Sequence, residues 1–322
     1  MKSEPVTLQQ AILYFAEPEN CRNYMVARRW PNGVSCPRCG SANVLFMEKY
    51  NRWHCREKHD APQFTLKTGT IMEDSPIGLD KWLTAMWMVV NCKNGISSYE
   101  IHRDLGITQK TAWFLDHRIR LAVQAGSMEK FSGEVEADET YVGGKAEFMH
   151  MDRRTRKLAE GTLGRGGQGK AIVFGLLDRN TKKAHVKVVS TPRKSELRGE
   201  IKKNVEAGSQ VYTDALKSYR GLPLDGFVHD FIDHAEAYVR GAVHTNGMEN
   251  FWSLFKRALK GTYVSVEPFH LQAYADEQAY RFNHRKLTDA ERFDLAVKGI
   301  VGKRITFDQL TGKTPDFATC SN

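Results

Sequence analysis

Residues 133–142, GEVEADETYV, decide the fold of the larger part of the chain. Apolar and acidic residues alternate there with the period of two that is typical of a β-strand, so the carboxylates of Glu134, Glu136 and Asp138 share one face. A row of carboxylates in the middle of a buried strand is costly unless a cation meets it. The segment therefore predicts a strand that carries a cation site.

Further strand and helix patterns follow this segment. AIVFGLL (171–177) is continuously apolar, and the strand-like AHVKVV (184–189) and SQVYTD (209–214) come after it, with a helix-like stretch at 193–207 between them. Helical patterns return at 246–260 and from about 268 to 300. This order predicts a mixed α/β domain. Residues 143–170 are rich in Gly, Lys and Arg, and they predict a mobile loop between the first two strands.

Two later carboxylates can join Asp138. Asp214 ends a predicted strand, and Glu249 lies in the first turn of a predicted helix, with 75 residues between the two aspartates and 34 between Asp214 and Glu249. Three converging carboxylates form a hard, oxygen-rich site that suits two Mg²⁺ or Mn²⁺ ions, and such a pair clamps a phosphodiester.

Each of these acids has a structural alternative. Glu136 or Glu139 could take the role of Asp138, and Asp214 could be a turn residue at the end of its strand. Asn246 and Glu249 have the spacing of a capping box, in which Glu249 would only satisfy the backbone of Asn246.

A zinc site is predicted nearer the N-terminus. Cys36 and Cys39 form a CxxC knuckle before Gly40, and Cys55 and His59 follow at a spacing that completes four ligands for one structural Zn²⁺. His54 competes with His59 for the fourth position. Such a small module would depend on the metal for its folding. The alternative is a set of unrelated thiols near a histidine.

Residues 97–105 and 108–121 form two short helical patterns around a Gly-containing turn, with Thr108 as a plausible N-cap. They predict a helix-turn-helix, whose second helix would present Gln109, Lys110, Thr111 and Arg118 to DNA. The alternative is a plain helical hairpin that packs on the apolar helix predicted at 80–92.

Composition narrows the class of protein. The 322 residues (36.6 kDa) are 41% hydrophobic, enough for a core, and carry a net charge of +9. No apolar stretch approaches the ~20 residues of a membrane span, and the N-terminus lacks a signal peptide, so we expect a soluble intracellular protein. The basic excess lies in residues 145–203, which favours a nucleic-acid partner, although a solvated lysine-rich face would give the same composition.

These residues together resemble a known family. CPRCG, NGISSYEIHRDLGITQKTAW, GEVEADETYVGGK, VYTDALKSYRGL and HTNGMENFWSLFKRALKGTY are similar to the zinc-ribbon DDE transposases of bacterial insertion sequences, the ISXO-like branch. The resemblance covers most of residues 29–286. It implies a ribonuclease-H-like catalytic domain, the acids Asp138, Asp214 and Glu249, and excision and integration of a DNA element through its terminal inverted repeats. It also implies a bacterial cytoplasmic protein that works on DNA as a homo-oligomer.

The predicted organisation has five parts: an N-terminal helical segment (1–33), a zinc ribbon (34–75), a helix-turn-helix region (76–128), the catalytic domain (129–266, with the loop 143–170) and a C-terminal helical tail (267–322). Further DNA contacts are predicted from basic residues of the loop and the 246–260 helix: Arg153, Arg154, Arg156, Lys157, Lys256 and Lys260. Two other functions stay open, a structure-specific nuclease on the same fold and a non-catalytic DNA-binding regulator.

Overall fold

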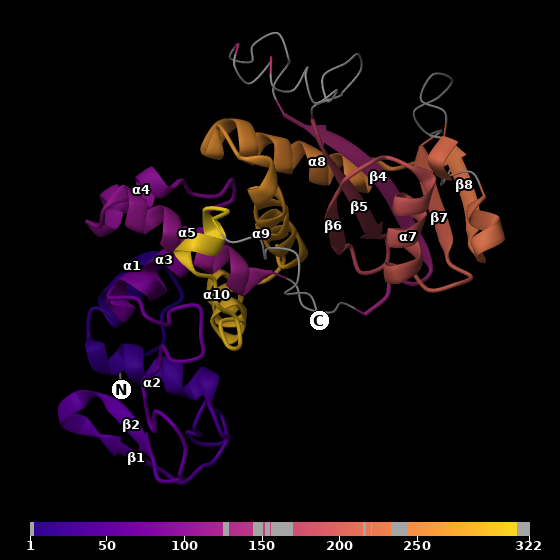
Figure 1. Ribbon diagram of the computed structural model, residues 1–322. Coiled ribbons are helices and arrows are strands. Elements are labelled where there is room, and N and C mark those ends of the chain that lie inside the picture. The colour runs from indigo at the N-terminus through magenta and orange to yellow at the C-terminus, as the bar shows by residue number, and fades with distance from the viewer. Residues whose placement is uncertain are drawn as a thin grey trace. The chain divides into compact units, whose positions relative to one another are not determined.

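In the computed structural model, residues 3–124, 129–143, 151, 155, 170–214, 217–219, 221–232 and 244–313 are described. The chain divides into two compact units, one of Met1–Gln124 with His284–Asn322 and one of Ala125–Asn283. The predicted chain class is confirmed: a mixed α/β chain with a zinc-ribbon-like region, a mixed sheet and a helical C-terminus (Figure 1).

The first unit is mainly helical. Its helices are α1 (Leu8–Phe15), α2 (Pro18–Arg29), α3 (Leu79–Asn91), α4 (Ser98–Leu105), α5 (Gln109–Val123), α10 (Asp289–Lys298) and α11 (Phe307–Leu310). Helix α3 is buried along most of its length, as its continuously apolar sequence predicts. The predicted N-terminal helical segment forms two helices, because Pro18 begins the second one in the favoured N1 position.

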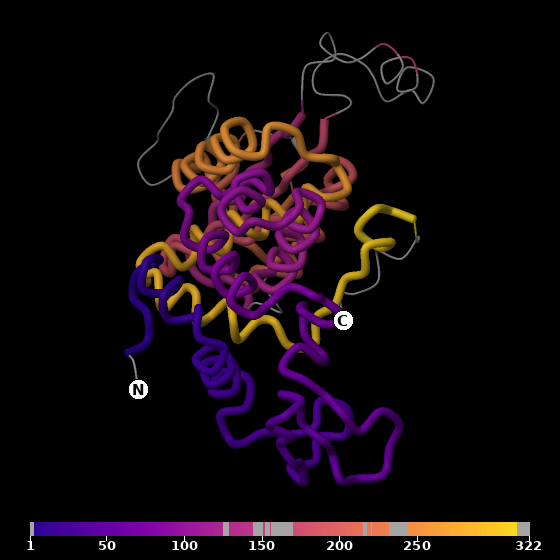
Figure 2. The backbone as a smooth tube through the Cα atoms, turned by 90° about the vertical axis from the view of Figure 1, so that its left-hand side faces the viewer, coloured from indigo at the N-terminus to yellow at the C-terminus, as the bar shows by residue number. Residues whose placement is uncertain are grey.

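The last part of the chain, from His284 onward, groups with the N-terminal helices in the first unit, whereas residues 267–283 belong to the second unit. Helix α10 packs on α3 and α2, and the tube view in Figure 2 shows the segment returning to the N-terminal helices. The physical reason is aromatic burial, because Phe293 lies against Phe15, Tyr24 and Trp87 with ring centroids 5.0–5.7 Å apart. The helical pattern predicted from 268 to 300 is thus broken at residues 284–288, between the two units.

A small antiparallel sheet lies in the same unit. Strands β1 (Val44–Met47), β2 (Arg52–Cys55) and β3 (Gln63–Phe64) pair in that order. Trp53 stacks on Phe64 and contacts Phe46, with ring centroids 5.9 and 4.9 Å away. Such a core is small, which is why a metal is needed to hold a ribbon of this size.

The second unit is built on a five-stranded sheet of order β6-β5-β4-β7-β8. Its strands are β4 (Glu134–Val142), β5 (Ala171–Asp178), β6 (Ala184–Val189), β7 (Gln210–Asp214) and β8 (Val228–Ile232). The first three pair antiparallel, whereas β7 is parallel to both β4 and β8. Strand β8 was not predicted from the sequence, whereas the other four were.

Helices cover both faces of this sheet (Figure 1). Helix α7 (Lys194–Asn204) buries Leu197 and Ile201 on one face, against Val135 and Ala137 of β4. Helix α8 (Asn246–Ala258), extended by a π-helical turn (Leu259–Tyr263), and helix α9 (Leu271–Asn283) cover the other face. The predicted loop 143–170 lies almost wholly outside the described residues.

Candidate functional site

Asp138 and Asp214 lie at the same level of the sheet. Strands β4 and β7 run parallel and pair Glu136 with Tyr212. Asp138 and Asp214 each follow this pair by two residues, so they are on the same face of the sheet as Glu136 and Tyr212. Asp138 lies in the middle of β4, and Asp214 is the last residue of β7. Residues far apart in the sequence are thereby neighbours.

The carboxylate of Asp138 is held by two donors. The backbone N–H of Glu139 donates to Oδ1 at 2.9 Å, and the indole Nε1–H of Trp252 donates to Oδ2 at 3.0 Å. Burial raises the pKa of Asp138 to about 6, the charges of Asp214 and Glu249 add to the rise, and the two hydrogen bonds oppose it. Asp214 and Glu249 are therefore near enough for their charges to raise the pKa of Asp138. Among the described residues, however, the three carboxylates do not form a compact ligand group of the kind that Cys36, Cys39, Cys55 and His59 form.

Trp252 reaches Asp138 because β5 has a glycine at the right place. Gly175 pairs with Asp138 across the β4–β5 ladder. A Cβ on Gly175 would lie 2.2 Å from Met248 Cε and 2.7 Å from a ring carbon of Trp252. The missing side chain thus allows α8 to pack closely on the sheet.

A buried carboxylate fastens the start of α8 to β4. Glu136, only 2% exposed, accepts from the backbone N–H of Met248 at 3.0 Å and from Arg179 Nε at 2.9 Å. Arg179 also donates to the carbonyl of His244 at 2.5 Å. A Cβ on Gly247 would lie 2.8 Å from Glu136 Oε2, so the helix approaches the carboxylate without a side chain between them. This link satisfies an N-terminal helix amide and holds the turn that carries Glu249.

Glu249 is exposed in the first turn of α8 and accepts from Thr245 Oγ1 at 3.4 Å. The capping box with Asn246 does not form, because Thr245 rather than Asn246 is the N-cap and its side chain makes no cap bond. The sequence missed the actual capping group, Glu136, because it comes from a distant strand.

Glu139 points to the opposite face of β4, where it accepts from the fully buried Tyr219 O–H at 2.5 Å. Burial raises the pKa of Glu139 to about 7, the Tyr219 hydrogen bond lowers it, and Asp214 and Asp138 raise it. Glu136 and Glu139, the two alternatives to Asp138, are therefore both engaged with protein partners.

The four predicted zinc donors converge in the first unit. Among the described residues, Cys36, Cys39, Cys55 and His59 are the group whose ligand atoms all lie within 4.8 Å of one another. His59 Nε2 lies 3.6 Å from Cys36 Sγ, while its Nδ1 lies 2.8 Å from the Asp60 carbonyl. That carbonyl fixes the tautomer with Nε2 free for a metal. Three thiols and one imidazole fit a closed, structural Zn²⁺ site.

His54 lies on the other side of the ribbon strand. It precedes Cys55 in β2 and pairs with Leu45 and Gln63. Because successive side chains of a strand point to opposite faces, His54 faces away when Cys55 faces the donors.

The two helices predicted around the Gly106 turn are present as α4 and α5, and they also contact α3. Thr108 caps α5 by accepting from the N–H of Thr111, and Gly106 ends α4 at φ +58°. Lys110 is exposed, Gln109 and Thr111 are half-buried, and the Gln109 amide donates to Ser98 Oγ at 3.1 Å.

The structure corrects the predicted exposure of Arg118. It was predicted as an exposed DNA contact, but it is 6% exposed and donates to the Glu73 carbonyl at 2.9 Å. The prediction was wrong because α5 is buried on most sides over its C-terminal half, so a polar residue there serves the interior.

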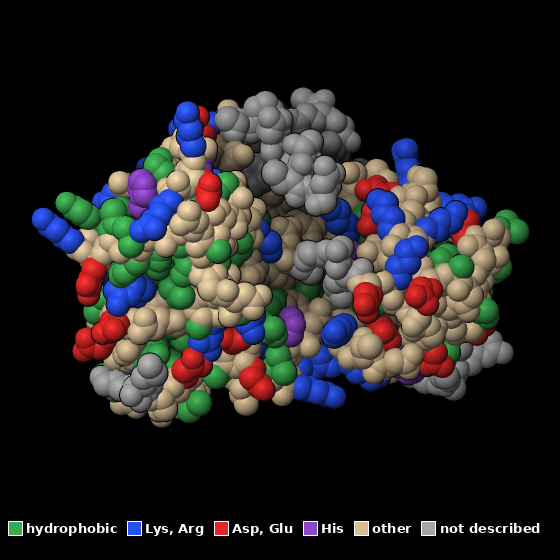
Figure 3. Space-filling view, turned by 90° about the horizontal axis from the view of Figure 1, so that it is seen from below, with side chains coloured by type: hydrophobic (Ala, Val, Ile, Leu, Met, Phe, Trp, Pro, Cys, Tyr) green, Lys and Arg blue, Asp and Glu red, His purple; other side chains and the backbone are tan. Residues whose placement is uncertain are grey.

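The remaining predicted DNA contacts divide into two groups. Lys256 and Lys260 are exposed, while Arg153, Arg154, Arg156 and Lys157 lie outside the described residues. On the surface seen in Figure 3, Lys and Arg side chains project at several places with acidic ones between them. No helix among the described residues has the length and apolarity to cross a bilayer.

Fold and donors define a chain with a zinc-ribbon-like module and a mixed α/β domain, in which Asp138 and Asp214 lie on adjacent parallel strands. Comparison with known protein families identifies the family within this class. The pattern of the ISXO2-like transposase domain matches residues 130–283, and that of the transposase zinc-ribbon domain matches residues 17–57. The chain belongs to the ISXO2-like transposases with a zinc ribbon.

Two curated proteins are similar. A protein described as uncharacterized in transposable element ISH50 of Halobacterium salinarum is 29% identical over 252 residues, which cover 76% of this chain and 84% of that protein. A transposase-like protein of Haemophilus influenzae is 30% identical over 105 residues, 33% of this chain and 85% of that protein. The family therefore supports a transposase enzyme, whereas the roles of individual residues stay predictions.

Proposed function

We propose that this protein binds the terminal inverted repeats of an insertion sequence, cleaves the DNA there with divalent metal ions, and joins the freed 3′-hydroxyl to target DNA in the bacterial cytoplasm. Asp138, Asp214 and Glu249 are the proposed catalytic acids. The proposal is supported by the parallel pairing of β4 with β7, whose register puts Asp138 and Asp214 on the same face, and by the charges of Asp214 and Glu249, which together with burial raise the pKa of Asp138.

The donor set fits a divalent cation. The pKa of Asp138 is raised by burial and by two further carboxylates, and a bound cation would relieve this repulsion. Asp138, Asp214 and Glu249 would hold two Mg²⁺ or Mn²⁺ ions, whose chemistry is to activate the attacking oxygen and stabilise the leaving oxygen.

The chain's own residues position these acids. Trp252 and the Glu139 N–H aim the Asp138 carboxylate, and both stay in place when the aspartate loses its proton, since each is a donor. Glu136 and Arg179 hold the first turn of α8 and therefore the backbone of Glu249. The protein thus contributes orientation and charge rather than a covalent nucleophile.

The first unit is the proposed recognition part. The zinc ribbon and the α4–α5 pair would bind the element ends, with Gln109, Lys110 and Thr111 at the start of α5 as the candidates for base contact. Joining two ends to one target requires more than one active site, so we propose a homo-oligomer on DNA.

The test is Mn²⁺-dependent cleavage of a plasmid that carries the gene's own flanking DNA. Glu249→Gln should reduce cleavage by about 100-fold or more, because a ligand charge worth several kcal/mol is lost. Glu206→Gln, an exposed residue of the same unit, removes the same charge and should cleave normally. Equal cleavage by wild type and Glu249→Gln would exclude Glu249 from the site.

A strand-joining assay on the same DNA separates the two catalytic possibilities. Covalent joining of the cut end to a second plasmid supports the transposase, whereas cleavage without joining indicates a nuclease. Binding without either reaction, in the presence of Mn²⁺, indicates a DNA-binding regulator.

A further inference from the structure

Helix α7 carries a row of three basic residues. Lys194, Arg198 and Lys202 follow one another at intervals of four, so they lie along one side of the helix. Leu197 and Ile201 occupy the side that packs on the sheet and are fully buried. We call Lys194, Arg198 and Lys202 the basic row.

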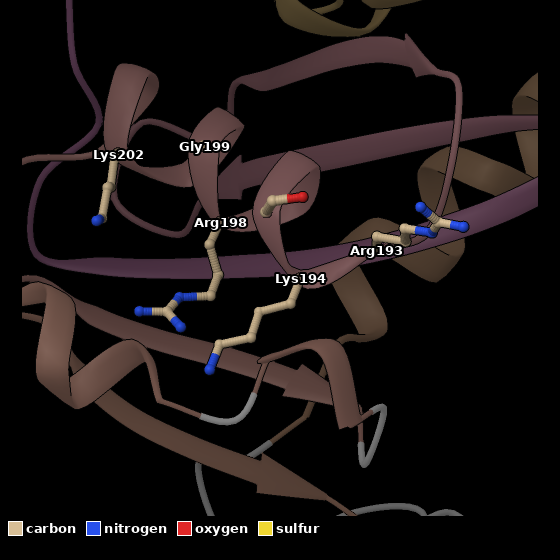
Figure 4. Close-up of a pocket in the computed structure, with 6 residues that line it drawn as sticks. Arg193, Lys194, Arg198, Gly199 and Lys202 are labelled. Atoms are coloured by element: carbon tan, nitrogen blue, oxygen red, sulfur yellow. The ribbon is translucent and has the colours of Figure 1, made fainter.

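The basic row lines a surface pocket of about 500 Å³. In Figure 4 the ends of Lys194 and Arg198 lie side by side, while Arg193 extends away from them. A Cβ built on Gly221 would lie 3.3 Å from Lys194 Nζ and 3.2 Å from an Arg198 terminal nitrogen, so both cations approach one point of the loop after β7. Gly221 has φ +94° and no side chain to fill this space.

The pocket keeps a positive charge. Asp225 binds both Arg198 and Lys202, the latter at 2.7 Å, and holds their side chains in place. Within the part of the chain that the structure describes, Lys194 has no ion-pair partner. Three cations against one carboxylate leave two positive charges for a ligand. An anion is therefore the ligand class that the pocket fits.

The start of the basic row lies at the same end of the sheet as the proposed catalytic acids. Strand β6 runs parallel to β4, because both are antiparallel to β5, and its last residue Val189 pairs with Ile172, which pairs with Tyr141 of β4. The chain then enters α7 within a few residues. Glu196 holds this connection by accepting from the N–H groups of Ser190 and Thr191 at 2.7 and 2.8 Å.

The described residues of the segment after β7 contact both places. It leaves Asp214, then Ser218 donates to the Pro192 carbonyl at 2.7 Å just before α7, and Tyr219 bonds Glu139 beside Asp138. It reaches the basic row at Gly221. The proposed catalytic acids and the start of the basic row therefore lie at the same end of the sheet, with Asp138 on the face that α8 covers and the basic row on the helix that covers the opposite face.

We propose that Lys194, Arg198 and Lys202 bind the phosphate backbone of the DNA strand that continues from the active site. Eight residues of helix cover about 12 Å, and one DNA strand presents a phosphate about every 3.4 Å along the duplex axis. The basic row thus spans about three successive phosphates. This inference rests on the proposed function and names the part of the protein that holds DNA beside the cut.

The experiment measures how the affinity of the full-length, zinc-loaded protein for a fluorescent 40-base-pair DNA duplex depends on salt. The test variant is Lys194→Gln with Lys202→Gln, which leaves Arg198 to hold Asp225. The control is Lys183→Gln with Lys203→Gln, two exposed lysines of the same unit outside the pocket, so the net charge is matched. Circular dichroism and thermal unfolding verify that both variants fold.

The test variant should lower the slope of log affinity against log salt by about 1.8, since each lost phosphate contact contributes ~0.9. Between 50 and 200 mM salt it should then lose about tenfold less affinity than wild type, whereas the control keeps the wild-type slope. Equal slopes in the two double variants would overturn the proposal, because net charge alone would then explain the effect.

Plasmid cleavage separates this inference from the proposed function. Cleavage by Lys194→Gln/Lys202→Gln should recover at high protein concentration, because binding is what the variant loses, whereas Glu249→Gln should not recover. If wild type neither binds nor cuts DNA, both proposals fail. If wild type cuts and the test variant binds and cuts like the control, only the basic row is refuted.

Discussion

The zinc cluster and the proposed carboxylate site depend on the fold of the chain in different ways. The four zinc donors come from residues 36–59, and their ligand atoms lie within 4.8 Å of one another. The three proposed catalytic acids come from residues 138–249, and their placement depends on a sheet register and on a docked helix. The first site depends on the spacing of neighbours in the sequence, and the second depends on a whole hydrophobic core.

The two sites therefore differ in whether the surrounding fold depends on a bound metal ion. The ribbon has few buried side chains, so its donors and its fold should appear or disappear together with the metal. The sheet around Asp138 is buried on both faces and should persist without any ion. In that state burial, together with the charges of Asp214 and Glu249, raises the pKa of Asp138.

The largest expected effect is on the ribbon. Cys39→Ser should remove the bound zinc and unfold residues 34–66, because zinc contributes on the order of 10 kcal/mol to such modules near pH 7. The zinc content of the purified protein, measured by metal analysis, should fall from one zinc per chain to nearly none. Hydrogen exchange should become fast in β1 and β2 and stay slow in β5.

Cys92→Ser is the matched control, since Cys92 lies outside the donor group. His59→Ala and His54→Ala sharpen the same test. Zinc loss with His59→Ala alone agrees with the donor geometry, whereas zinc loss with His54→Ala alone would show that the fourth ligand is wrongly assigned.

The next effect concerns the link between β4 and α8. Glu136→Gln leaves the guanidinium of Arg179, whose side chain is 8% exposed, without its buried partner. Breaking one side of a buried pair costs about 3–5 kcal/mol. Urea unfolding should report this loss for the second unit, and the amide of Met248 should lose protection in hydrogen exchange.

Glu134→Gln is the control for this link. Glu134 also lies near Arg179, at 3.7 Å, but its side chain is 50% exposed, and exposed pairs contribute about 0–1 kcal/mol. Equal destabilisation by the two variants would mean that the bond to the α8 backbone does not hold the helix.

The smallest expected change in the free energy of unfolding is a stabilisation, opposite in sign to the changes above. Asp138→Asn should abolish cleavage and yet stabilise the metal-free protein at pH 8 by about 1–3 kcal/mol, because a shift of about two pKa units corresponds to roughly that free energy. An unfolded aspartate ionises near pH 4 and the folded one near pH 6. Ionisation of Asp138 therefore lowers the free energy of unfolding of the wild-type protein as the pH rises from 4 to 6. The greater stability of the Asp138→Asn variant should vanish below pH 4.

Denaturant unfolding at pH 4 and pH 8, without divalent ions, measures this difference. Asp230→Asn, an exposed acid on β8, should change stability by less than about 0.5 kcal/mol at either pH. A destabilised Asp138→Asn protein at pH 8 would argue against repulsion among the three acids.

Much of this protein could be predicted from local patterns alone. The period of two in residues 133–142, the Cys36–Cys39 knuckle and the Thr108 cap each specify a short piece of backbone, because the geometry involved spans only a few residues. The order and spacing of the three acids can likewise be seen in the sequence, and the transposase family could be predicted from the sequence motifs.

Only the tertiary structure decided which partner each polar group found. The cap of α8 is Glu136 from a strand 112 positions away rather than a neighbour in the sequence, Gly175 owes its role to Trp252 on another element, and Arg118 is internal rather than exposed. Burial and hydrogen bonding depend on elements that are distant in the sequence and pack together only in the fold. The periodicity of a segment assigns a residue to one face of a helix or strand, but it does not identify the element that covers this face.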